Sequence, residues 1–107
     1  SMSAHRVPPG SGVYSATKYA VRSLTEGLRK ELRELQSSIR VSAISPGFVE
    51  TEFAEKFHRS KAKAEAVYNQ YPVLRAEDIA EAVMHVVDAP PHMEIHDLLL
   101  RPTQQSS

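Results

Sequence analysis

Residues 14–18 read Tyr-Ser-Ala-Thr-Lys and open the longest amphipathic segment of the chain. Tyr14 and Lys18 are four residues apart, so on a helix their side chains share a face. An ammonium group beside a phenol favours the phenolate, and the pKa of Tyr14 is therefore expected to fall from its usual value of about 10. A tyrosine tuned in this way can act as a general acid or base. Taken alone, the two residues are more simply an ordinary surface pair, and their neighbours decide between the two interpretations.

A helix is predicted from Tyr14 to about Leu35. Its apolar residues recur at spacings of three and four, which is typical of a helix with one buried stripe. The stripe consists of Val21, Leu24, Leu28, Leu32 and Leu35, whereas Arg22, Glu26, Arg29, Lys30 and Arg33 cover the other side.

Two short strands and another helix are predicted after it. Ile39–Ile44 is rich in β-branched residues and ends at the breakers Ser45-Pro46-Gly47, which suits a strand of a parallel sheet. A helix from Glu77 to about Asp88 is stopped by Pro90-Pro91, and Ile95–Leu100 follows as the final strand. Strand, helix and strand in this order, with a crossover of this length, are what a parallel pair requires. The fold class is therefore α/β.

Three further features stand at fixed places around Tyr14 and Lys18. Ser1 lies thirteen residues before Tyr14, and the first strand ends in Pro46-Gly47, with Thr51 four residues after the glycine. In this order and spacing, the chain resembles the C-terminal half of the short-chain dehydrogenase/reductase family over essentially its whole length. The resemblance implies the C-terminal half of a Rossmann-like doubly wound parallel sheet, with residues 1–107 as the C-terminal catalytic portion of that domain.

The resemblance also implies an oxidoreductase that interconverts an alcohol and a carbonyl with NAD or NADP. Tyr14 would exchange a proton with the substrate oxygen, Lys18 would bind the nicotinamide ribose, and Ser1 would donate a hydrogen bond to the substrate oxygen. Glycine at position 47 would let the backbone approach a flat ring, with backbone near Phe48 and the Thr51 hydroxyl holding the carboxamide. The implied catalytic residues are Ser1, Tyr14 and Lys18, and the implied cofactor contacts are Tyr14, Lys18, Pro46, Gly47, Phe48 and Thr51.

The C-terminal segment carries a narrower resemblance. Residues 89–96, Ala-Pro-Pro-His-Met-Glu-Ile-His, continuing to Arg101-Pro102-Thr103, are similar to the branch of NADP-dependent enzymes that oxidise 3-hydroxy acids such as serine. That branch implies NADP and a small alcohol or carbonyl substrate. In the family, the helix beginning at Tyr14 contacts another subunit, so a homo-oligomer is expected, with Ala16 and Ala20 facing the partner. Helices at Thr51–Phe57 and Lys61–Tyr71 would form a substrate lid.

The nucleotide-binding half of such a fold is missing from the sequence. The chain has four glycines, and none stands in a G-x-G-x-x-G array. The 107 residues are therefore expected to be inactive alone. They would be a fragment of a longer native protein or an engineered or incompletely read sequence, in which Ser1-Met2 would be a cloning remnant. Two strands cannot form a parallel sheet covered on both faces, so the fragment is expected to be marginal or to assemble by exchange of elements.

Composition excludes several classes of partner and site. Thirteen basic residues balance thirteen acidic ones, which argues against a nucleic-acid partner. No cysteine is present, so disulfides and thiolate metal sites are excluded. No apolar run approaches the roughly 20 residues that span a bilayer. A soluble, cytoplasmic protein is expected, with no membrane partner. Residues 104–107 are predicted to be a frayed end.

Alternative functions have weaker support in the sequence. Ser1 or Ser3 with His5 would suggest a hydrolase, but no G-x-S-x-G elbow accompanies them. His92 and His96 have the spacing of helical metal ligands, but they follow Pro90-Pro91 in an extended segment, and no metal site is predicted. A sugar-nucleotide epimerase or dehydratase would use the same tyrosine and lysine. A helical assembly module without catalysis is the remaining alternative.

Overall fold

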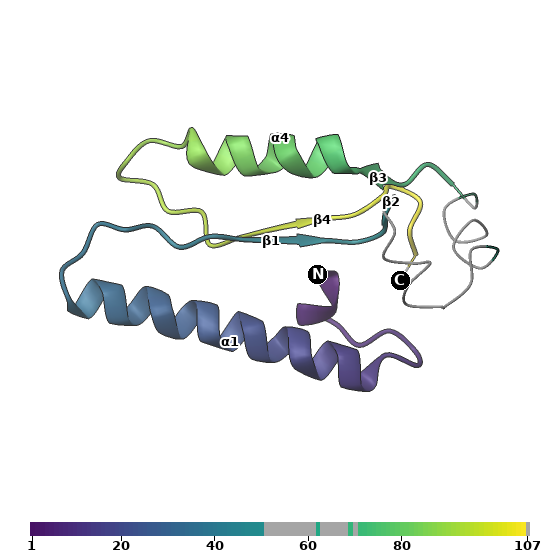
Figure 1. Cartoon of the computed structure of the whole chain (residues 1–107), viewed down its shortest axis with the longest axis horizontal. Helices are drawn as coiled ribbons and strands as arrows, with labels where there is room; N and C mark the ends of the chain where they lie inside the picture. The colour runs from purple at the N-terminus through teal and green to yellow at the C-terminus, as the bar shows by residue number, and fades with distance from the viewer. Residues whose placement is uncertain (51–61, 63–68, 70, 107) are drawn as a thin grey trace.

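A parallel pair of strands lies between two helices in the computed structural model, which describes residues 1–50, 62, 69 and 71–106 (Figure 1). Helix α4 covers one face of the pair and α1 the other, with the 3-10 turn η1 between α1 and the strands. In chain order the elements are η1 (Met2–Ala4), α1 (Gly12–Glu34), β1 (Ala43–Pro46), β2 (Val49–Glu50), β3 (Leu74–Arg75), α4 (Ala76–Val87) and β4 (Asp97–Leu100).

Strands β1 and β4 pair in parallel, which confirms the predicted α/β class with a parallel sheet. Ala43 lies opposite Asp97, and Pro46 lies opposite Leu100. A second, shorter parallel pair joins β2 to β3 just beyond the end of β1, and the sequence pattern did not predict it. The carboxyl ends of β1 and β4 therefore open toward the Pro46-Gly47 turn.

The first strand begins later than predicted. Ile39–Ile44 was the expected range, but pairing starts at Ala43. Before Ala43, the backbone N–H and carbonyl groups form hydrogen bonds with side chains rather than with another strand. Arg29 donates to the Val41 carbonyl at 3.0 Å, and the Val41 N–H donates to Glu94 at 3.0 Å. Arg33 donates to the carbonyl of Ile39 in the same way. The final strand likewise begins at Asp97 rather than Ile95.

Helix α1 has the predicted extent, but its apolar stripe is not buried. Leu24 is 73% exposed and Val21 is 56% exposed, whereas the side chain of Arg29 on another face is buried. The spacing of apolar residues correctly identified which side chains share a face. It was wrong about the covered face, because the face turned to η1 and the strands carries Ser15, Arg22 and Arg29, which bond to backbone carbonyls.

Helix α4 confirms the predicted second helix to within one residue at each end. The Asp78 carboxylate accepts the N–H of Arg75 at 2.8 Å and so satisfies one of the free donors at its N-terminus. Beyond its C-terminus, Arg40 donates to the carbonyls of Ala89, Pro90 and Met93. These bonds fold the Pro90-Pro91 segment back toward β4.

Up to residue 106, the last described one, the C-terminal tail is not frayed, which contradicts the prediction there; Ser107 lies outside the described residues. Pro102 is buried, and Gln105 is only 3% exposed. The apolar core is small: in residues 1–50 and 71–106, Met2 and Ala4 are the buried hydrophobic side chains. The tail and η1 thus supply much of the buried material around the end of β1.

Candidate functional site

Tyr14 and Lys18 lie one turn apart near the start of α1, as predicted. The Lys18 Nζ is 5.4 Å from the centroid of the Tyr14 ring, within the range of a cation–π contact. Both side chains are partly buried. The ammonium group is therefore held against the phenol rather than turned away into solvent.

The segment before Tyr14 is fixed by serines. Ser15 is fully buried, and its hydroxyl donates to the Arg6 carbonyl at 3.4 Å. The Ser11 hydroxyl donates to the Pro8 carbonyl at 2.7 Å, closing a turn in which Gly10 has a φ of 76°. Glycine adopts that left-handed conformation at little cost. These contacts set where α1 begins, and so where Tyr14 stands.

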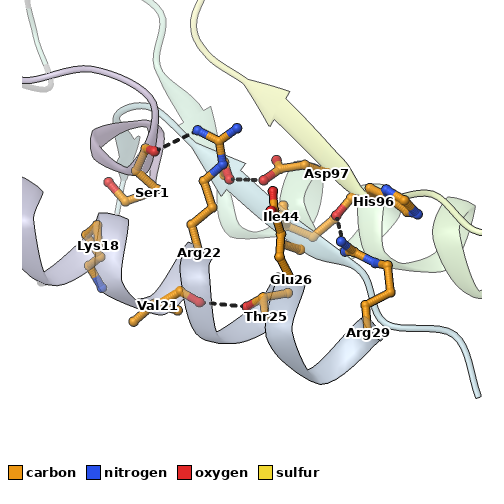
Figure 2. A pocket seen from close by; sticks show the side chains of 13 residues that line it. Ser1, Lys18, Val21, Arg22, Thr25, Glu26, Arg29, Ile44, His96 and Asp97 are labelled. Atoms are coloured by element: carbon orange, nitrogen blue, oxygen red, sulfur yellow. Dashed lines mark hydrogen bonds between the residues drawn. The ribbon is translucent and has the colours of Figure 1, made fainter. Parts of the chain in front are cut away.

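Ser1 is the N-cap of η1 and lines a cavity together with Lys18 of α1. Its Oγ accepts the Ser3 N–H at 3.1 Å, which leaves the hydroxyl hydrogen of Ser1 available for donation. Figure 2 shows Ser1 and Lys18 lining one cavity together.

Asp97 joins η1 to the strands. Its Oδ2 lies 3.2 Å from the His5 Nε2 and accepts the Ser45 hydroxyl at 3.0 Å. The other carboxylate oxygen, Oδ1, is buried and has no hydrogen-bond partner in the described part of the chain. Because His5 directly follows η1, this contact holds the Ser1 segment on β1 and β4.

The Pro46-Gly47-Phe48 turn stands at the carboxyl end of β1. The Gly47 N–H donates to the Leu100 carbonyl at 2.6 Å, which continues the pairing with β4. The Phe48 N–H donates to the Gln105 Oε1 at 3.0 Å, and its carbonyl accepts the Leu74 N–H at 3.1 Å. The turn is thus fixed from both sides.

A cavity of about 210 Å³ lies between α1, η1 and the β1–β4 pair (Figure 2). Ser1 and Lys18 reach it, together with Arg22, Arg29 and Asp97, but Tyr14 does not line it. Ligands of open α/β sheets bind beyond the carboxyl ends of the strands, where the Pro46-Gly47 turn lies. The cavity as a whole is therefore not assigned to the substrate, and among its lining residues Ser1 and Lys18 are the candidate site residues.

Near the opposite end of α1, Glu94 contacts a cluster of basic side chains. Its carboxylate lies 3.0 Å from Arg33 and from His96, and 3.6 Å from Arg29. The Val41 N–H, followed by His96 and the two arginines, holds the pKa of Glu94 below its usual value, although partial burial opposes the shift. This cluster fixes the far end of the helix to the strands and lies away from Tyr14.

Thr51 and most of the predicted lid lie outside the described residues. Burial raises the pKa of Tyr71, which makes it a poorer source of phenolate.

The described residues contain no group of three side chains suited to hold a metal ion. No helix in the described ranges is long and apolar enough to cross a bilayer.

The structure thus places Lys18 against the Tyr14 ring and beside Ser1 in one cavity, which Tyr14 does not line. Two residues near the site, Asp97 and Gln105, were not identified from the sequence. Asp97 directly precedes the apolar run Leu98–Leu100, and a charged residue next to a predicted buried strand is a signal that could have identified it. Gln105 stands in a polar tail with no distinguishing pattern.

Comparison with known proteins gives a consistent result. The family profile described as Enoyl-(Acyl carrier protein) reductase matches residues 1–89. Dehydrogenase/reductase SDR family member 11 from Bos taurus is 56% identical over 108 residues, covering 98% of this chain and 42% of the relative. The closed form of serine dehydrogenase complexed with NADP+ is 37% identical, with a TM-score of 0.91, over 100% of this chain and 43% of that one. Serine dehydrogenase from Escherichia coli is 31% identical, with a TM-score of 0.74, and 39% of it is covered.

The chain spans less than half the length of these relatives. The profile match over residues 1–89 includes the Tyr14 and Lys18 pair, β1 and the turn after β1, whereas β4 lies beyond it. The chain therefore belongs to the short-chain dehydrogenase/reductase family, and its residues correspond to the C-terminal part of the family's Rossmann-like fold.

Proposed function

We propose that these residues form the catalytic portion of an NAD(P)-dependent oxidoreductase that interconverts an alcohol and a carbonyl. The observation that carries the proposal is the Lys18 ammonium, 5.4 Å from the Tyr14 ring centroid at the start of α1. In the proposed reaction, this ammonium group offsets the negative charge that develops on the phenol oxygen as Tyr14 gives up its proton. Membership of a dehydrogenase/reductase family supports the same reaction class.

In this proposal, Tyr14 is the group that moves the proton. In the reducing direction its hydroxyl gives a proton to the substrate oxygen, and in the oxidising direction the phenolate takes it back. Lys18 stabilises the phenolate, and the Ser1 hydroxyl donates a hydrogen bond that holds the substrate oxygen beside Tyr14. Asp97, through His5, keeps the Ser1 segment in place.

The Lys18 ammonium group and the turn after β1 are proposed to hold the nicotinamide end of a dinucleotide. Lys18 provides a cation for the ribose hydroxyls, and the Pro46-Gly47-Phe48 turn stands at the carboxyl end of β1. The bound cofactor supplies or accepts the hydride. Thr51 is proposed as a carboxamide contact from the sequence resemblance. No glycine-rich phosphate turn occurs in the 107 residues, so we propose that the chain is inactive alone.

We further propose NADP as the cofactor and a small 3-hydroxy acid as the substrate. The solved structure described as serine dehydrogenase complexed with NADP+ matches this chain with a TM-score of 0.91. Its name supports NADP as the cofactor and a 3-hydroxy acid, serine, as the kind of substrate. A cytoplasmic location stays a prediction from the sequence.

A homo-oligomer in which α1 contacts a second subunit is also proposed. The exposed side of α1 carries Val13, Val21, Leu24 and Leu28, with Ala16 and Ala20 also exposed. A contiguous apolar face of this kind is typical of a protein interface.

Substitution of Tyr14 by phenylalanine tests the proposed reaction. The intact mass of the protein from its source is measured first, to establish the length of the polypeptide that carries these residues. NADPH-dependent reduction of a panel of small carbonyls is then compared for the parent protein, Tyr14→Phe and the control Tyr19→Phe.

We expect Tyr14→Phe to lower kcat by a factor of about 10² to 10⁴, the usual contribution of a general acid. Tyr19→Phe, which changes an exposed tyrosine on the same helix, should keep the parent rate. Equal rates for the Tyr14 variant and the parent would refute the proposed role of Tyr14.

A further inference from the structure

Gln105 connects the C-terminal tail to two parts of the candidate site. Its side chain is 3% exposed, although it lies two residues from the end of the chain. Its Oε1 accepts the Phe48 N–H at 3.0 Å, and its Nε2 lies 2.9 Å from the Met2 Sδ. A buried glutamine amide is therefore bonded on one side to the turn after β1 and on the other to η1.

The fit between Gln105 and the turn is close. A Cβ atom added at Gly47 would lie 2.3 Å from the Gln105 Oε1, nearer than any non-bonded contact allows. The backbone of the tail is itself fixed, because the Gln105 N–H donates to the carbonyl of buried Pro102 at 3.1 Å. The amide thus fills the space that a side chain at position 47 would take.

The contacts of Gln105 reach both sides of the site. Phe48 belongs to the turn proposed to hold the nicotinamide, and Met2 directly follows Ser1, which is proposed to hold the substrate oxygen. The tail ends beside η1 in Figure 1, in agreement with the contact to Met2. One side chain therefore sets the turn and η1 relative to each other.

We propose that Gln105 is a positioning residue for cofactor binding, a role that rests on the proposed function. It acts through Phe48 by accepting the backbone N–H of the turn after β1. Loss of this acceptor leaves a partly buried N–H without its partner, which is costly, so without Gln105 the turn relaxes away from its present geometry. The bond to Met2 makes the same residue hold η1 against that turn.

Gln105→Met is the central test, because methionine keeps about the same volume and removes both polar contacts. Gln105→Glu is the rescue variant, since its carboxylate can still accept the Phe48 N–H. Gln104→Met is the matched control, because Gln104 is the exposed neighbour. Each variant is made in the native protein, and two quantities are measured: hydrogen exchange at the Phe48 amide, and kcat and KM for NADPH.

We expect Gln105→Met to speed exchange at the Phe48 amide by about tenfold and to raise the KM for NADPH by about threefold to tenfold, the range of one lost hydrogen bond. The kcat should change by less than about twofold, because the reacting groups are untouched. Gln105→Glu should recover most of the protection at Phe48, and Gln104→Met should match the parent.

Two results would overturn the proposal. In the first, Gln105→Met leaves the Phe48 exchange rate equal to that of Gln104→Met. In the second, the exchange rate at the Phe48 amide rises but the KM for NADPH does not. The bond between Gln105 and Phe48 would then exist without positioning the cofactor. Failure of the proposed function is seen separately, as full activity of Tyr14→Phe or no oxidoreductase activity in the parent. Exchange at Phe48 does not depend on either.

Discussion

Gly47 occupies a position where a side chain cannot fit. A Cβ there would lie 2.3 Å from the Gln105 Oε1 and 2.8 Å from the Arg101 Cβ. The Gln105 amide can rotate away, but the Arg101 Cβ is fixed to the backbone, so Gly47→Ala must move the tail or the turn, and we expect it to lower the free energy of unfolding by about 1–3 kcal/mol, the usual cost of overpacking. Urea denaturation measures the change.

Gly27 provides the control for that substitution. It lies in the middle of α1, and a Cβ there would meet nothing within 4 Å. Gly27→Ala should raise stability by about 0.5–1 kcal/mol, because alanine is the better helix former. Opposite signs for the two substitutions identify the contact with Gln105 and Arg101 as the cause. A neutral Gly47→Ala would contradict the described packing of the tail.

At the scale of single residues, the site residues that could be predicted are those fixed by local spacing along the sequence. Tyr14 and Lys18 were placed correctly because four residues on a helix return to the same face. Gln105 was missed for the opposite reason, since its partners Phe48 and Met2 lie 57 and 103 residues away in sequence. Nothing in a tail of glutamine and serine distinguishes a buried amide from a solvated one.

At the scale of elements, Glu94 fixes the second half of α1 to the strands. Its carboxylate accepts the Val41 N–H and contacts Arg33, Arg29 and His96. The resulting fall in its pKa means that the folded state binds a proton at Glu94 less readily than the unfolded state. The contribution to stability is therefore complete above pH 4.5, the ordinary value, and is lost as the pH falls through the lower folded pKa.

Glu94→Gln is expected to lower the free energy of unfolding at pH 7 by about 1.5–3 kcal/mol, the range for hydrogen bonds to a charged group. The parent should lose stability more steeply than the variant as the pH falls below 4.5. Unfolding free energies measured in urea from pH 7 to pH 3 give both curves. Parallel curves would show that Glu94 does not contribute to the acid dependence.

The same cluster explains why helices were predicted better than strands. A helix satisfies its backbone within a local segment, so apolar periodicity and Pro90-Pro91 located α1 and α4 closely. A strand begins where a partner is available. At residues 39–41, Arg29, Arg33 and Glu94 take the backbone groups instead, and β-branched composition cannot report that.

At the scale of the whole molecule, the parallel topology was predictable but the covered face of α1 was not. Order and crossover length restrict the pairing of β1 and β4 to a parallel arrangement. Which side of a helix is buried depends on what packs against it. In the described structure, the arginine-bearing side of α1 meets η1 and the strands, and the leucine-bearing side faces outward.

That outward side predicts self-association of the 107-residue chain. Leu24 is 73% exposed and Leu28 is 49% exposed, while Met2 and Ala4 are the buried apolar side chains of the described residues. Burial of apolar surface is worth roughly 25 cal/mol per Å², so a second copy covering this face is favoured over a solvated monomer. Light scattering after gel filtration should give a mass above the 11.9 kDa of one chain.

Leu24→Lys should shift that distribution toward the monomer, because a lysine in the covered face leaves a charge to be desolvated on association. Ser23→Lys adds the same charge at the adjacent exposed position, which points about 100° away around the helix, and should leave the assembly unchanged. A parent chain that elutes as a monomer, or two variants that dissociate equally, would mean that the leucine side of α1 does not hold the copies together.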